Sequence, residues 1–128
     1  MITELLDESE DNLRRRGKTR AWIRQRSEKG HFNNIVRELM IEDTAAYKEM
    51  MRMNYDDFCA ILQTIEQFIT PKEIMGGTQV IKAPERLTLA IRFMATGETF
   101  RSLSFQFRIS TSAICYIIRD VCKALKAH

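Results

Sequence analysis

The chain has 128 residues, which is enough for one modest domain or a small domain with a flexible arm, and too few for a second, catalytic domain. Hydrophobic residues make up 45% and charged residues 29%, an ordinary globular composition, so most of the chain should fold. The net charge of +3 is uneven: −5 over residues 1–13, +8 over 14–37, −4 over 38–57, −1 over 58–85 and +5 over 86–128. Two basic blocks favour a polyanionic partner, although a merely solvated surface explains them equally well.

Membrane, secreted and metal-dependent classes of protein are disfavoured by the sequence. No apolar run approaches the roughly 20 residues of a transmembrane helix, and the acidic start lacks the features of a secretory signal, so we expect an intracellular protein without a membrane partner. The three cysteines form no CxxC pair, which disfavours a disulfide framework. The two histidines, His31 and His128, each stand alone, and we expect neither a metal nor another cofactor.

Residues 1–20 are expected to form a flexible arm that is first acidic and then basic. Residues 1–11 have little apolar periodicity, and the basic run that follows would repel itself in a compact core. The cationic residues of this arm are Arg14, Arg15, Arg16, Lys18 and Arg20. Three interpretations stay open: a nuclear import signal, an arm that enters the DNA minor groove, or a charged linker. Trp22 and Ile23 come next and give the arm a place to dock.

The remainder, residues 21–128, is expected to be a helical domain, and its first helices are signalled by apolar spacing and caps. Over residues 32–40 the predicted buried stripe consists of Phe32, Ile35, Val36, Leu39 and Met40. Asp43 is a plausible N-cap for a segment through Met53, and Asn54 for a helix over residues 55–69 that ends at Thr70-Pro71. The predicted buried face of that longer helix consists of Phe58, Ile61, Leu62, Ile65, Phe68 and Ile69.

Residues 71–83 are predicted to be a connector, because they contain Gly76-Gly77 and only a short apolar pair. Pro84 suits the first turn of the next helix, and Gly97 is placed to end it in the left-handed conformation. The residues of this helix expected to face inward are Leu87, Ala90, Ile91, Phe93 and Met94. The predicted fold is therefore all-α, with five or six short helices packed as one domain.

Residues 99–127 read as a short helix, a tight break and a longer amphipathic helix, which is the pattern of a helix-turn-helix. Thr99 and Ser110 are the expected N-caps of the two helices. The longer helix should bury Ala113, Ile114, Ile117, Ile118, Val121 and Leu125 and expose Thr111, Ser112, Cys115, Tyr116, Arg119, Asp120, Lys123 and Lys126. A plain antiparallel helix pair that only completes the core is the alternative.

Two residues weaken the helix-turn-helix assignment. Arg108 stands in the turn where many such motifs carry glycine, so the turn is wider or Arg108 adopts an ordinary conformation. The charge of Asp120 opposes close approach of phosphate unless it pairs with Arg119 or Lys123.

Four segments together resemble the N-terminal region of Harbinger-type transposases and of the nuclease-like proteins derived from them. The segments are residues 54–58 (NYDDF), 84–97 (PERLTLAIRFMATG), 100–103 (FRSL) and 107–114 (FRISTSAI), and the similarity runs from about Arg20 to Lys126. The resemblance implies a helical DNA-binding region that, in full-length relatives, precedes an RNase H-like nuclease domain with three metal-binding carboxylates. We expect the chain to lack such a domain, and predicted helix starts explain Asp56, Asp57 and Glu85. We therefore expect no catalytic residue.

The expected function is that of a nuclear DNA-binding module whose last helix docks on duplex DNA. The expected DNA-binding residues are Arg101, Arg108, Ser110, Thr111, Ser112, Tyr116, Arg119 and Lys123. Hydroxyls can contact phosphates or base edges, Arg119 can present a two-donor fork to guanine, and lysines can neutralise backbone charge. The first alternative is a protein-interaction module that works with a Myb-like partner through the methionines of residues 50–53. The second is an N-terminal fragment of a metal-dependent nuclease.

Overall fold

The computed structural model describes residues 21–71 and 80–128, and within these ranges it is all-α, with no strand. The predicted arm of residues 1–20 and most of the predicted connector lie outside the described residues. The elements are α2 (Ala21–Arg24), α3 (Arg26–Lys29), the π-helix η1 (Phe32–Val36), α4 (Arg37–Glu42), α5 (Thr44–Met51), α6 (Tyr55–Ile69), α7 (Ala83–Thr96), α8 (Phe100–Phe107) and α9 (Thr111–Ala127). The helices outnumber the predicted five or six because the N-terminal part is divided into short pieces.

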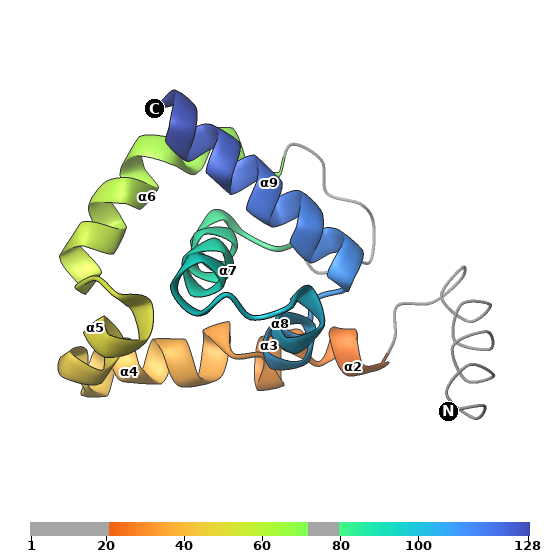
Figure 1. Ribbon diagram of the computed structural model, residues 1–128. Helices are drawn as coiled ribbons and strands as arrows, with labels where there is room; N and C mark the ends of the chain where they lie inside the picture. The colour runs from red at the N-terminus through yellow and green to blue at the C-terminus, as the bar shows by residue number, and fades with distance from the viewer. Residues whose placement is uncertain (1–20, 72–79) are drawn as a thin grey trace.

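Helix α7 is the centre of the core. It packs against α5, α6, α8 and α9, and Figure 1 shows it in the middle of the molecule with the other helices around it. Five consecutive residues of α7, numbers 87–91, are buried, so this helix is covered on nearly all sides. A helix enclosed in this way fixes the positions of the helices that surround it, including α8 and α9.

Side-chain caps define where most of the longer helices begin. Asp43, Asn54, Thr99 and Ser110 each accept a hydrogen bond from the backbone amide three residues further on, at 2.9–3.2 Å. All four caps were predicted from the sequence, and each contributes about 1 kcal/mol to helix stability. Gly97, with φ of 67°, ends α7 in the left-handed conformation, as predicted.

The predicted helix over residues 32–40 is wrong in one respect, because its first part is a π-helix. The amide of Val36 donates to the carbonyl of His31 at 3.0 Å, which is the five-residue spacing of a π turn. The wider turn changes the helical phase. Val36 stays buried, whereas Ile35, predicted to be buried, is 41% exposed.

Other predicted core residues prove to be exposed, and some predicted surface residues prove to be buried. Phe68 is exposed and stacks on the imidazole of His128, and Met94 is exposed because burial of α7 declines after Ile91. In contrast, Met51 is fully buried at the end of α5, which stops there and not at Met53. Met50 and Met53 are half-buried and pack against the core, so only part of the methionine cluster is accessible to a partner.

Candidate nucleic-acid interface

Helices α8 and α9 are joined by a turn of three residues, Arg108 to Ser110. Arg108 has φ of 56° and ψ of 49°, the left-handed conformation, so the sequence expectation of a wider turn or an ordinary Arg108 is corrected. This conformation costs a non-glycine residue about 1–2 kcal/mol. Ile109, which is only 1% exposed, anchors the turn in the core.

Contacts of the Arg108 side chain with α2 hold the strained turn in place. Its guanidinium carbon lies 3.6 Å from the centroid of the Trp22 ring, and its Nη1 donates to the Trp22 carbonyl at 3.3 Å. A cation–π contact of this kind contributes about 0.5–1 kcal/mol at an exposed site and more where it is desolvated. The half-buried Arg108 therefore connects the first described residues to the start of α9.

Helix α9 has a buried face and an exposed face, as the sequence predicted. The buried residues are Ile114, Ile117, Ile118, Val121 and Ala124. Ser112, Tyr116, Arg119 and Lys123 are exposed on the other side, and the Tyr116 side chain is 66% exposed. Ala113 and Leu125, predicted to face inward, are half-buried and pack at the edge of the core.

The N-terminal residues of α9 are less accessible than its middle. Ser110 and Thr111 are half-buried, and Ser110 Oγ accepts from the amide of Ala113. The hydroxyl hydrogen of Ser110 remains a donor while its oxygen caps the helix. The first turn of α9 therefore offers hydroxyl donors, and the middle offers long side chains.

The charged groups of α9 have partners that the sequence pattern did not indicate. The Arg119 Nη2 lies 3.9 Å from Cys115 Sγ, one helical turn earlier. Asp120 acts on Arg86 of α7: burial lowers the pKa of the Arg86 guanidinium, and the Asp120 carboxylate opposes that shift. Asp120 is thus partly balanced by a cation of the core helix.

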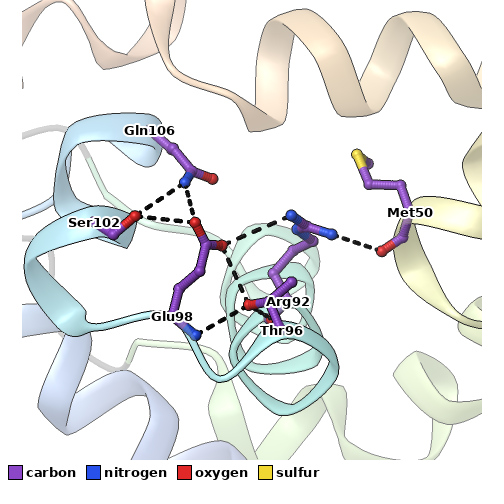
Figure 2. A network of polar contacts seen from close by, with 6 residues as sticks. All are labelled: Met50, Arg92, Thr96, Glu98, Ser102 and Gln106. Carbon is purple, nitrogen blue, oxygen red and sulfur yellow. Dashed lines mark hydrogen bonds and ion pairs between the residues drawn. The ribbon is translucent and has the colours of Figure 1, made fainter.

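A polar network around Glu98 positions α8 against α7. The Glu98 carboxylate accepts hydrogen bonds from Ser102 Oγ at 2.9 Å and from Gln106 Nε2 at 2.5 Å (Figure 2). Arg92 of α7 lies 3.7 Å from the same carboxylate and donates to the carbonyl of Met50 at 2.8 Å. One carboxylate therefore links α8 to α7 and, through the arginine, to α5.

The pKa of Glu98 reflects this network. Burial alone would raise it, but hydrogen bonds from Gln106, Ser102 and Thr96, together with the Arg92 charge, lower the pKa below its ordinary value. The pKa of His31, which packs on Phe107, is lowered by burial and by Arg92 and raised by Glu98, with a net lowering. The network therefore favours an ionised Glu98 and a neutral His31.

A second ion pair, buried on the opposite part of α7, could not be found from the sequence pattern. Arg26 Nε lies 3.1 Å from Glu85 Oε1, and Arg26 Nη2 donates to the carbonyl of Val80 at 3.2 Å. Glu85 is only 4% exposed, so it is more than the helix-start residue that the sequence suggested. Burial raises the pKa of Glu85, and the charges of Arg26 and Arg86 oppose that shift.

Within residues 21–71 and 80–128 there is no group of three or more His, Cys, Asp or Glu side chains that could hold a metal ion. The three cysteines, Cys59, Cys115 and Cys122, are free thiols. Among the described helices, none combines the length and the apolar character needed to cross a bilayer.

Comparison of the chain with models of protein families, with curated protein sequences and with solved structures gives no significant match in any of the three cases. A functional proposal for this chain therefore rests on the geometry of α8, the turn and α9, and on the charges around them.

Proposed function

We propose that the chain is a nuclear DNA-binding module of the Harbinger transposase type, which docks α9 on duplex DNA and has no nuclease activity of its own. The observation that carries the proposal is the exposed face of α9, where Tyr116, Arg119 and Lys123 lie opposite a buried apolar face. The 17 residues of α9 extend about 26 Å, enough to follow a major groove across several base pairs. The short turn before α9 is compatible with a helix-turn-helix.

The proposed roles come from position and chemistry. Arg119 presents a two-donor fork to a guanine edge, and Lys123 neutralises a phosphate. Tyr116 and Ser112 contact phosphates or base edges beside them. Ser110 and Thr111 donate to phosphate at the start of α9, where the helix dipole also favours an anion. Arg101 and Arg108 add positive charge from α8 and the turn.

The expected basic arm, residues 14–20, lies outside the described residues, and its contact with DNA stays a proposal. A Myb-like protein partner also stays a proposal. Met51 is buried, and Met50 and Met53 are half-buried, so the methionines offer such a partner only part of their surface.

Salt titration of duplex binding tests the proposed function. Each phosphate contact contributes a slope of about −0.9 to log affinity against log salt concentration. The double variant Arg119→Ala, Lys123→Ala should reduce that slope by about 1 to 2 and lower affinity at least tenfold, because it loses a base contact and a phosphate contact.

The matched control is the double variant Lys48→Ala, Lys82→Ala. It removes an exposed lysine of α5 and an exposed lysine at the N-cap of α7. It changes the net charge equally and should retain most of the affinity. Affinity that is unchanged in a folded Arg119/Lys123 variant, or that falls equally in the control, would show that α9 is not the contact surface.

A further inference from the structure

Two exposed aromatic rings and two arginines lie together on the surface of α2 and α8. Arg101, Phe105 and Arg108 succeed each other at intervals of four and three residues, so they share one face of α8 and its cap. Trp22 of α2 lies beside them, with its ring centroid 6.4 Å from that of Phe105 and the rings nearly perpendicular. We call these four residues, Trp22, Arg101, Phe105 and Arg108, the aromatic strip.

Cations alternate with rings along the aromatic strip. The guanidinium of Arg108 lies over Trp22, and that of Arg101 lies 5.6 Å from the centroid of Phe105. Phe105 is 58% exposed and Trp22 is 42% exposed. Because the two exposed rings adjoin, they form an apolar patch, and such a patch indicates a contact surface more strongly than a single exposed ring does.

The surroundings of the aromatic strip are basic. Of the described residues that adjoin Trp22 in sequence, numbers 21–37 carry a net charge of +3, and Arg24 is exposed two residues after Trp22. The one carboxylate of the loop before α8, Glu98, is turned to another face of that helix, where it binds Ser102 and Gln106. A partner of the strip is therefore polyanionic and has flat apolar groups that can stack on rings.

We infer that the aromatic strip is a stacking site for unpaired nucleotides, so that the protein binds single-stranded DNA at this surface as well as duplex DNA on α9. Unpaired bases stack on aromatic rings regardless of sequence, and alternating arginines neutralise the phosphates between them. Because Arg108 belongs both to the strip and to the turn before α9, a strand that continues from a bound duplex reaches the strip directly. The inference rests on the proposed function for this continuity, but not for the stacking itself.

The fluorescence of Trp22 reports on the strip directly, because this is the only tryptophan in the chain. The probe is a 12-nucleotide oligothymidylate, which forms no duplex, added to the full chain. Stacking of a base near Trp22 should quench its emission in a saturable manner. If the strip binds a protein and not nucleotides, the oligothymidylate should leave the emission of Trp22 unchanged. That result would overturn the inference.

The variant Phe105→Leu removes the more exposed ring, and affinity for the oligothymidylate should fall about tenfold, the effect expected for one lost stacking contact. Phe68→Leu is the matched control, since Phe68 is also an exposed phenylalanine but lies on α6. Circular dichroism checks that both variants are folded. Equal affinity in Phe105→Leu and the unchanged protein would contradict the inference.

Two further probes separate this inference from the proposed function. Blunt duplex binding tests α9 alone, and a duplex with a 6-nucleotide single-stranded extension should bind more tightly than the blunt form by a factor that Phe105→Leu removes. Binding of the blunt duplex without quenching by oligothymidylate would overturn the strip and leave α9 in place. Quenching by oligothymidylate without duplex binding would overturn the docking of α9 on duplex DNA and leave the aromatic strip in place. An extension made of RNA shows whether the sugar matters.

Discussion

Glu85 lies in the first turn of α7, and Glu98 lies just after the end of that helix. Each is paired with an arginine, yet their pKa values are displaced in opposite directions. Glu85 is almost fully buried, and the pKa of its carboxyl is raised because burial disfavours the charged form. Glu98 keeps more contact with solvent, and hydrogen bonds from its neighbours hold its pKa below the ordinary value. An arginine partner alone therefore does not determine how stable a carboxylate is.

Besides burial, the two carboxylates differ in the number of hydrogen-bond donors that they receive. Glu98 receives bonds from Ser102 and Gln106 in addition to the charge of Arg92. Within the described residues, Oε1 of Glu85 receives no aligned hydrogen bond, although Arg26 Nε is 3.1 Å away. A buried carboxylate needs several donors to offset its lost hydration, and one ion pair supplies few.

The largest expected effect is on the buried pair. Glu85→Ala removes the buried carboxylate that lies 3.1 Å from Arg26 Nε and should lower the free energy of unfolding by about 3 kcal/mol. Urea unfolding at pH 7 measures the loss. The double variant Arg26→Met, Glu85→Leu replaces both charges by apolar groups and should recover most of it. A loss below about 1 kcal/mol in the single variant would mean that the pair is hydrated and the comparison with Glu98 fails.

A smaller effect is expected at the Glu98 network. Glu98→Ala removes the acceptor for Ser102 and Gln106 and should lower the free energy of unfolding by about 1–2 kcal/mol. Ser102→Ala, which removes a single donor, is the internal control and should cost less. If Glu98→Ala proves as destabilising as Glu85→Ala, the network carries more of the fold than its partly exposed position indicates.

The smallest expected effect is on how stability varies with pH, and it tests whether the pKa of Glu98 is lowered in the folded protein. Because the folded pKa of Glu98 is lowered, its contribution to stability is complete above its unfolded value of 4.5 and is lost as pH falls through the folded pKa. The raised pKa of Glu85 acts in the opposite sense. The stability difference between the unchanged protein and Glu98→Gln should therefore shrink between pH 6 and pH 3, since Glu85 is common to both. A difference that stays constant over that range would contradict a lowered pKa.

Much of the fold could be predicted from local sequence signals. Helix caps such as Asn54 and Ser110 act within three residues, and the left-handed Gly97 acts at its own position, so the bounds of α6 and the starts of α8 and α9 were predictable. The buried face of α9 was predictable for the same reason, because its apolar spacing is regular.

Features that join distant parts of the chain were not predictable. The Arg26–Glu85 pair and the Trp22–Arg108 contact depend on how α2 and α3 dock, and no spacing rule connects those residues. The π turn at η1 was not predicted for another reason. The apolar pattern of this segment also fits an ordinary α-helix, and only the exposure of Ile35 in the structure distinguishes the two. For the candidate site, most of the exposed residues of α9 were predicted, although Thr111 and Cys115 are half-buried, and the aromatic strip was not predicted.

The aromatic strip exists only when two segments from opposite ends of the sequence are assembled. The amide of His31 donates to the carbonyl of Gln106 at 2.9 Å, and a Cβ at Gly30 would lie only 3.0 Å from the carbonyl oxygen of Phe107. Glycine thus permits the backbone contact that keeps the segment after Trp22 against α8. A fragment consisting of α8 and α9 alone would retain the exposed face of α9. It would lose Trp22 and, with it, the contacts that hold the Arg108 side chain. The two surfaces are therefore separable pieces of the same molecule, one carried by a local hairpin and the other created by tertiary assembly.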